Sequence, residues 1–223
     1  MSAVAFNPNG KWGVSGGFDG VVAAWKVATG EELWRLEKQG TVTALAVDPT
    51  GAHVFVAANR SVHVLELGTG KPLRTHGPFR APVVSLGVSP NGKWYAAGSD
   101  DGTTRVWKLG ETAADFTLTG HTGPVRSVAL KDGKWVLTGG ADGTVRLWDT
   151  AVKAAPAAVF GKHGHPVVTA AFLANGTQTI SGDRELTVLP WKVDKFMGPR
   201  PMVPPERIDH PVGPPDTIPY AQP

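Results

Sequence analysis

A histidine and an aspartate, His121 and Asp142, are the residues of this chain that could most readily do chemistry. A histidine oriented by a carboxylate can act as a general base and activate a neighbouring hydroxyl as a nucleophile. The same pair can also serve as a buried structural contact that joins two loops. The elements that position the pair decide between the two interpretations.

Two further histidines, His163 and His165, are close enough in sequence to suggest a metal site. A zinc site normally needs three or four ligands at recognisable spacing, and no third ligand accompanies this pair. The chain contains no cysteine, which excludes disulfides and thiolate metal sites. We therefore predict an ordinary loop here, with no metal and no cofactor.

The composition of the 223-residue chain argues against several classes of protein. Its formal charge is only +3 and no run of lysine or arginine exceeds two residues, whereas nucleic-acid-binding surfaces normally cluster their cations. No apolar run approaches the roughly 20 residues of a membrane-spanning helix. The segment from Met1 to Pro8 lacks the regions of a signal peptide. We therefore expect a cytoplasmic protein that does not bind membranes, and the charge pattern argues against a nucleic-acid partner.

A short phrase centred on glycine recurs five times along the chain. It reads Asn-Pro-Asn-Gly-Lys-Trp at 7–12, and related versions follow about every 41 residues. The central glycines are Gly10, Gly51, Gly92, Gly133 and Gly176. A period of this size is typical of an array of similar structural units, and such arrays mostly present binding surfaces.

Each repeat is predicted to contain four short strands, which we name a to d in chain order. In the fourth repeat these strands cover 124–130, 135–140, 144–148 and 156–160. Asp-Gly pairs at 132–133 and 142–143 favour tight turns between them. Short strands separated by turns indicate an all-β fold. Four strands in each long repeat favour a β-propeller of about five four-stranded antiparallel blades.

The repeats divide the chain into a propeller over residues 1–197 and a proline-rich tail over 198–223. The individual repeats cover about 2–40, 41–81, 82–123, 124–165 and 166–197. Nine prolines fall in the last 25 residues, and proline removes the N–H donors that a strand needs. We therefore predict an irregular tail.

The fourth repeat contains Gly-His at 120–121, Asp142 before strand c, and Trp148-Asp149 at the end of that strand. With these residues at this spacing, it resembles the WD-repeat family of β-propellers. Similar versions occur in repeats one and three, and the resemblance covers about residues 2–193. It departs in detail, because only one literal Trp-Asp pair is present, repeat two lacks the tryptophan, and Pro190 lies inside strand c of repeat five.

The resemblance implies a structural role for the histidine and the aspartate. In this family Asp142 would fix the tautomer of His121, the imidazole would contact Thr138, and that hydroxyl would meet the indole of Trp148. The other repeats offer partial versions, which are His163, Ser181, Glu185 and Trp191 in repeat five, Phe79, Ala97, Asp101 and Trp107 in repeat three, and Ser15, Asp19 and Trp25 in repeat one. We therefore expect one complete network, in repeat four, and mostly apolar packing elsewhere.

The resemblance also implies a non-enzymatic scaffold that binds a protein or peptide. In such propellers the d-to-a loops and the b-to-c turns line one rim, where partners dock. The residues expected at this rim are Phe18, Arg60, Arg80, Asp100, Thr122, His165 and Arg184. Two alternatives stay open: a regulatory C-terminal portion of a larger enzyme or signalling protein, and a nucleic-acid- or chromatin-associated propeller.

The number of repeats leads to a last expectation, about ring closure. Propellers of this family usually have seven blades, whereas this chain has five repeats, opens on a strand a and ends on a strand c near Trp191. We expect an open or partial ring with an uncovered flank on the first blade and an uncovered edge on the fifth. Missing upstream blades or another chain, as in a homo-oligomer, would fill the gap.

Overall fold

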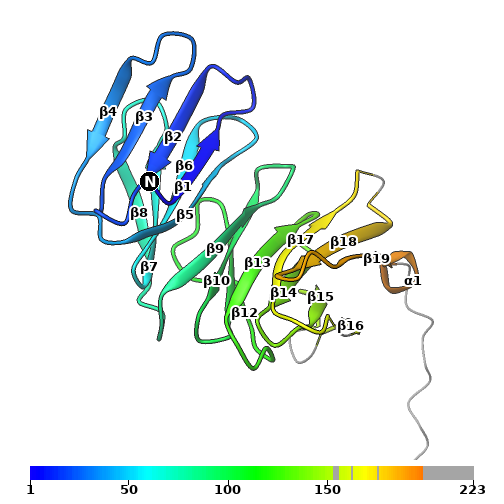
Figure 1. Ribbon diagram of the computed structural model, residues 1–223. Helices are drawn as coiled ribbons and strands as arrows, with labels where there is room; N and C mark the ends of the chain where they lie inside the picture. Colours follow the sequence, from blue (N-terminus) through cyan, green and yellow to red (C-terminus); the bar gives the residue numbers. More distant parts are fainter. Residues whose placement is uncertain (153–155, 162, 175, 198–223) are drawn as a thin grey trace, which may run out of the picture.

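The computed structural model describes residues 1–152, 156–161, 163–174 and 176–197, so the predicted proline-rich tail lies outside the described residues. The strands form five antiparallel sheets, which we call blades one to five. Figure 1 shows the blades side by side in an arc, with blade one and blade five at its opposite ends. The prediction of an all-β fold made of propeller blades is confirmed.

Blades one to three contain four strands each, in sequence order across the sheet. Blade one consists of β1 (Ala3–Phe6), β2 (Trp12–Gly16), β3 (Val22–Lys26) and β4 (Glu32–Leu36). Blade two consists of β5 (Val42–Val47), β6 (His53–Ala58), β7 (Ser61–Glu66) and β8 (Pro72–His76). Blade three consists of β9 (Val83–Val88), β10 (Trp94–Ser99), β11 (Thr104–Lys108) and β12 (Phe116–Leu118).

Blade four has four strands, and blade five has three strands among the described residues. Blade four consists of β13 (Val125–Leu130), β14 (Trp135–Gly140), β15 (Val145–Asp149) and β16 (Ala158–Phe160). Blade five consists of β17 (Val167–Phe172), β18 (Gln178–Asp183) and β19 (Val188–Lys192), and the one-turn helix α1 (Asp194–Met197) follows it. The repeat pattern of the sequence does not predict this helix. None of the described helices is long and apolar enough to cross a membrane.

The apolar core lies between the blades, because alternate residues of a strand point to opposite faces of its sheet. In blade three, Tyr95 and Trp107 pack with residues of blade two. Their neighbours Ala96 and Val106 pack with residues of blade four. Each inner blade is therefore apolar on both faces, and its stability depends on the two blades beside it.

A valine at the start of strand a fills the same place at each blade junction. Val125 and Val167 are fully buried, and each points at a strand-b glycine of the preceding blade. A Cβ added to Gly98 would lie 2.8 Å from Val125 Cγ1, and one added to Gly139 would lie 2.6 Å from Val167 Cγ1. At these two junctions an added Cβ would therefore force atoms of the next blade to shift.

A hydroxyl near the start of strand a joins each blade to the next. Ser2 donates to the carbonyl of Val42 at 2.6 Å, and Ser85 donates to that of Val125 at 2.8 Å. Thr43 donates in the same way to the carbonyl of Val83, whereas Ser127 donates to that of Ala170, three residues further along strand a of blade five. This ladder of side-chain bonds sets the register between neighbouring blades.

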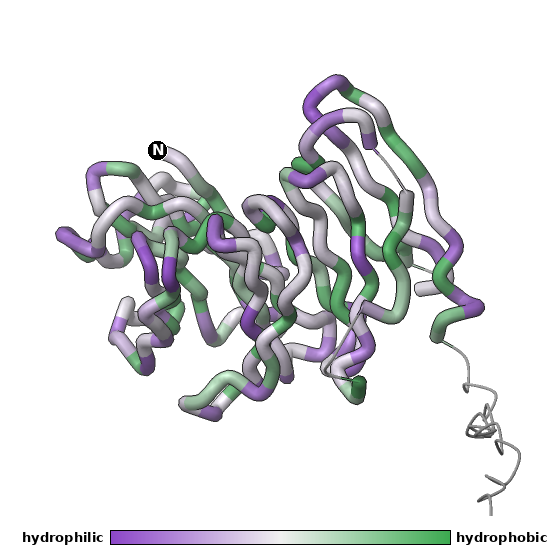
Figure 2. The backbone as a smooth tube through the Cα atoms, turned by 90° about the horizontal axis from the view of Figure 1, so that it is seen from below, coloured by the Kyte–Doolittle hydropathy of each residue, from purple (hydrophilic) through white to green (hydrophobic). Residues whose placement is uncertain are grey.

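The turns form two rims, one at each end of the strands. At one rim a backbone bond joins the residue after strand c to the a-to-b turn, as from Leu109 N–H to Lys93 O at 2.8 Å. At the other rim the b-to-c turns are bonded to the d-to-a loops. Figure 2 shows hydrophilic segments mostly in these turns and hydrophobic stretches within the sheets.

Candidate functional site

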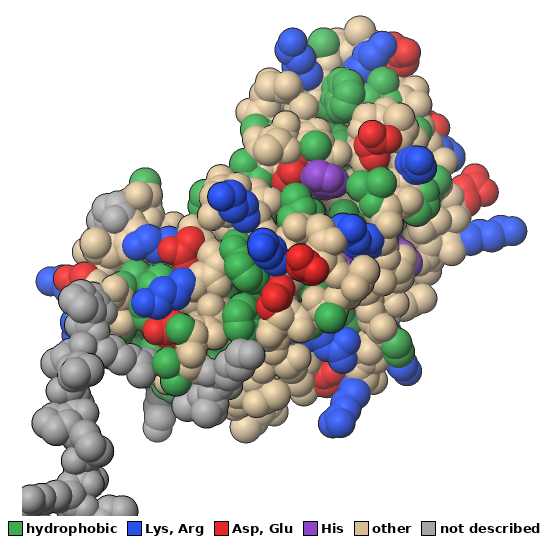
Figure 3. Space-filling view, turned by 180° about the vertical axis from the view of Figure 1, so that it is seen from behind, with side chains coloured by type: hydrophobic (Ala, Val, Ile, Leu, Met, Phe, Trp, Pro, Cys, Tyr) green, Lys and Arg blue, Asp and Glu red, His purple; other side chains and the backbone are tan. Residues whose placement is uncertain are grey.

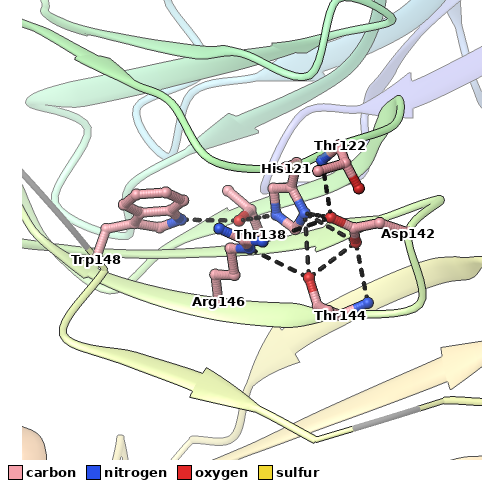
Figure 4. A network of polar contacts seen from close by, with 7 residues as sticks. All are labelled: His121, Thr122, Thr138, Asp142, Thr144, Arg146 and Trp148. Atoms are coloured by element: carbon pink, nitrogen blue, oxygen red, sulfur yellow. Dashed lines mark hydrogen bonds and ion pairs between the residues drawn. The ribbon is translucent and has the colours of Figure 1, made fainter.

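The residues expected to form a polar network in blade four do so (Figure 4). His121 lies in the loop before β13, and its Nδ1 is 3.0 Å from Asp142 Oδ2 in the β14–β15 turn. Its Nε2 is 2.7 Å from Thr138 Oγ1 on β14. The indole N–H of Trp148 on β15 donates to the same hydroxyl at 2.8 Å. The network thus joins the rim to the two middle strands.

The hydrogen-bond pattern fixes where each proton lies. Asp142 accepts bonds from the backbone N–H groups of Thr122 and Thr144, both at 3.0 Å. Burial raises the pKa of the Asp142 carboxyl, but these bonds and the nearby His121 together hold its pKa below the usual value. Burial lowers the pKa of His121, although Asp142 opposes this. A neutral imidazole therefore donates from Nδ1 to the carboxylate and accepts the Thr138 proton at Nε2.

Blade five contains a second complete network, which corrects the expectation of a single one. Nδ1 of His163 is 3.1 Å from Asp183 Oδ2, and its Nε2 is 2.7 Å from Ser181 Oγ. Trp191 N–H donates to Ser181 Oγ at 2.8 Å. The carboxylate comes from Asp183, so the prediction that Glu185 would supply it is wrong.

The register of the strands explains why the carboxylate comes from a different position. Asp183 occupies the same place in β18 that Gly140 occupies in β14, since each pairs with the first residue of its strand a. A Cβ added to Gly140 would point at His121, lying 2.8 Å from its Cε1. Either a carboxylate at this strand position or one two residues later can therefore reach the imidazole.

The other blades keep parts of the network, as expected. In blade one, Trp25 N–H donates to Ser15 Oγ at 2.8 Å. In blade three, Phe79 takes the histidine position and is buried, with its ring centroid 6.1 Å from that of Trp107. Apolar contact thus replaces the imidazole bridge in blade three.

These networks are built as structural contacts rather than as reactive sites. The Thr138 side chain is fully buried, and both its bonds are within the network. Ser15 lies in Gly13-Val-Ser-Gly-Gly17, which matches the spacing of a nucleophile elbow. It is, however, inside β2 rather than at a strand-to-helix turn.

The second histidine pair is not arranged to bind a metal. Both ring nitrogens of His163 take part in hydrogen bonds, so neither is free to coordinate. His165 is exposed. Within the described part of the chain, no three side chains of the metal-binding types gather.

The seven candidate rim residues all lie in the d-to-a loops or b-to-c turns, and one of them, Thr122, is exposed in the loop before β13. Phe18, Arg60, Arg80, His165 and Arg184 are exposed, and Asp100 is half-buried. Phe18 belongs to blade one and Arg184 to blade five, which lie at opposite ends of the arc (Figure 1). The seven residues therefore follow the rim and do not form one compact patch.

Backbone hydrogen bonds bring the rim loops of adjacent blades together. The N–H of Phe79 donates to Arg60 O at 2.8 Å, and the N–H of Arg184 donates to Pro166 O at 3.2 Å. Asp100 Oδ1 lies 3.9 Å from an Arg126 guanidinium nitrogen. The rim is thus a fixed backbone that carries exposed side chains.

Comparisons with known proteins agree with this architecture. A family model described as "WD domain, G-beta repeat" matches residues 1–26, 70–108 and 114–149. The chain is 30% identical over 116 residues to "Small ribosomal subunit protein RACK1y" of Oryza sativa subsp. japonica, covering 49% of this chain and 34% of that protein. It is 31% identical over 135 residues to "Periodic tryptophan protein 2 homolog" of Dictyostelium discoideum, covering 58% of this chain and 15% of that protein.

A third relative gives a similar result. The chain is 30% identical over 122 residues to "Small ribosomal subunit protein RACK1" of Drosophila melanogaster, covering 51% of this chain and 38% of that protein. The chain thus spans between 15% and 38% of the length of these relatives. In its matching repeats, its related sequences and its four-stranded antiparallel blades, the chain is similar to the WD-repeat family.

Proposed function

We propose that this chain is a non-enzymatic scaffold that binds a protein or peptide through the rim of d-to-a loops and b-to-c turns. The proposal rests on a contrast at the rim. Hydrogen bonds hold the backbone of the rim loops in place, whereas several rim side chains are exposed and make no ion pair with a described residue. Phe18 is 69% exposed. Arg60 and Arg184 are exposed and make no ion pair with any described residue.

The physical properties of such a rim support binding. A backbone that is already ordered loses little entropy when a partner binds. Aromatic and arginine side chains are enriched among the residues that contribute most to interfaces. The family whose repeat model matches this chain typically consists of protein-interaction scaffolds.

Affinity capture from cell extract tests the proposal. The triple variant Phe18→Ala, Arg60→Ala and Arg184→Ala should lose specific partners, while its stability changes little because exposed substitutions usually cost under about 0.5 kcal/mol each. The matched control is Lys11→Ala with Lys93→Ala in the a-to-b turns of the opposite rim. If the control lost the partners and the triple variant kept them, the proposed face would be wrong.

The names of the relatives favour a second candidate, binding to a ribonucleoprotein surface. Two of the proteins above are named as small ribosomal subunit proteins. Against direct contact with nucleic acid, Figure 3 shows lysine and arginine interspersed with acidic side chains on the face it presents. Binding to random DNA should therefore be weak, and a steep loss of affinity with salt would favour the nucleic-acid candidate.

A further inference from the structure

A groove lined by two arginines runs along the outer strands of blade three and opens at the rim. Its volume is about 390 Å³. Arg80 lies in the loop before β9, and Arg105 projects from β11. The remaining lining residues are Asp101, Thr103, Ala114, Thr117 and Thr119. Three hydroxyl groups and two guanidinium groups thus face one space.

Arg105 is held in place without an anionic partner. Its guanidinium carbon lies 4.2 Å from the centre of the Phe79 ring, a cation–π contact that fixes the group. No ion pair or hydrogen bond joins its side chain to the described part of the protein. Its N–H donors are therefore positioned and still available.

Blade four provides an internal comparison for Arg105. Arg146 occupies the equivalent place, since it pairs with Thr138 as Arg105 pairs with Ala97. Arg146 is only 15% exposed in its side chain and lies 3.6 Å from Asp142. In blade three, Phe79 takes the place of the histidine. The equivalent arginine there, Arg105, makes no ion pair with a described carboxylate.

The carboxylate in the groove, Asp101, does not neutralise the arginines. Its Oδ1 accepts bonds from the N–H of Thr103 at 2.9 Å and from the Thr103 hydroxyl at 2.6 Å. Its Oδ2 accepts the backbone N–H of Arg80 at 3.2 Å. Two cationic groups against one engaged carboxylate leave the groove with an excess positive charge.

We propose that this groove binds the phosphate of a phosphorylated serine or threonine in a partner peptide. A phosphate carries about −1.5 to −2 charges and three acceptor oxygens, enough for both guanidinium groups and a threonine hydroxyl. Arginine forks pair with such oxygens in a bidentate manner. The inference rests on the proposed function, because it places a specific peptide group at the scaffold's rim.

Fluorescence polarisation with the full chain tests this assignment. The probe is a labelled peptide library with a central phosphoserine and degenerate flanking residues, compared with the same library carrying serine or glutamate. We expect the phosphorylated library to bind at least about tenfold more tightly than either, since charge-assisted bonds are about twice as strong as neutral ones. Equal binding of the serine or glutamate library would overturn the assignment.

Substitutions of the two groove arginines test whether the phosphate binds in this groove. Arg105→Gln and Arg80→Gln should each weaken phosphopeptide binding about tenfold, and Arg105→Lys, which retains the charge but loses the fork, should weaken it less. The matched control Arg126→Gln removes an arginine that pairs with Asp100 and does not line the groove. An equal loss in the control would place the phosphate elsewhere.

Competition with inorganic phosphate distinguishes a site for phosphopeptides from a site for free phosphate. Inorganic phosphate should compete only at concentrations far above the peptide, and competition at equal concentration would show a site for free anions instead. The result is also separable from the proposed function. If phosphopeptides fail to bind while the rim triple variant still loses its partners, only the groove assignment fails.

Discussion

At the scale of single residues, blades four and five both contain a histidine bonded to an aspartate, but the aspartate comes from a different position in each blade. In blade four the carboxylate bonded to histidine comes from the turn, at Asp142. In blade five it comes from the end of the strand, at Asp183. Sequence spacing could identify the histidines, the hydroxyls and the tryptophans. It could not choose between Asp183 and Glu185, because the choice depends on which position points at the imidazole.

Substitution of the two carboxylates in blade five tests this assignment. Asp183→Ala should lower the melting temperature, because it leaves His163 Nδ1 buried without its acceptor. Glu185→Ala should leave it unchanged, since Glu185 is exposed. In blade four, Asp142→Ala should destabilise the protein by about 1–3 kcal/mol for the same reason. A larger effect at Glu185 than at Asp183 would contradict the assignment.

The buried histidines also predict how stability depends on pH. Burial lowers the pKa of His121 and of His76; Nε2 of His76 is 2.6 Å from the Tyr95 hydroxyl. The unfolded chain binds protons below about pH 6.5, whereas the native state does not. Stability should therefore be constant above this pH and fall as the pH drops below it.

Urea unfolding at pH 7.5 and at pH 5.5 measures this dependence. The wild type should be less stable at the lower pH. His76→Gln removes one of the buried imidazoles. The difference in the free energy of unfolding between pH 7.5 and pH 5.5 should therefore be smaller in this variant. A wild-type stability that rises on acidification would contradict the assignment of neutral buried histidines.

At the scale of the elements, the strands follow from local sequence while their junctions do not. The glycine phrases and alternating residues predicted blades, turns and order correctly. The junctions depend on contacts between residues about 40 positions apart, such as Ser85 with Val125. No local pattern indicates that Gly98 faces the next blade. The groove was missed for the same reason, since it requires Phe79 and Arg105 to meet across a loop and a strand.

Adding a methyl group at a junction glycine tests this close approach. In Gly98→Ala the new Cβ would lie 2.8 Å from the backbone oxygen of Val125, which cannot move aside easily. We expect a loss of about 1–3 kcal/mol of stability. Gly161→Ala is the control, since nothing lies within 4 Å of its added Cβ. Equal melting temperatures for the two variants would contradict the packing described for the junction.

At the scale of the whole molecule, the described residues form an arc in which blades one and five each have a neighbouring blade on one side only. Blade one exposes Val4 and Phe6, at 46% and 59%. Blade five repeats the inner junction pattern, because Thr169 pairs with Gly182 as Ser127 pairs with Gly139. An exposed face built like an inner junction favours association.

We therefore expect the purified chain to self-associate as its concentration rises. Light scattering coupled to size exclusion should detect species larger than the monomer. Thr169→Glu places a charge on the open face of blade five, since the exposed Thr169 occupies the position of the junction residue Ser127, and should reduce the association. A stable monomer with a closed ring of five blades would contradict the open arc.

The central claim is that the rim of d-to-a loops and b-to-c turns binds the partner. Site-specific photo-crosslinking in cell extract tests it most directly, with the crosslinking side chain placed at Phe18, Arg60 or Arg80 on this rim and at Lys11 or Lys93 on the other. The account predicts discrete crosslinked species from the first set and none from the second. Crosslinks confined to Lys11 and Lys93 would contradict it.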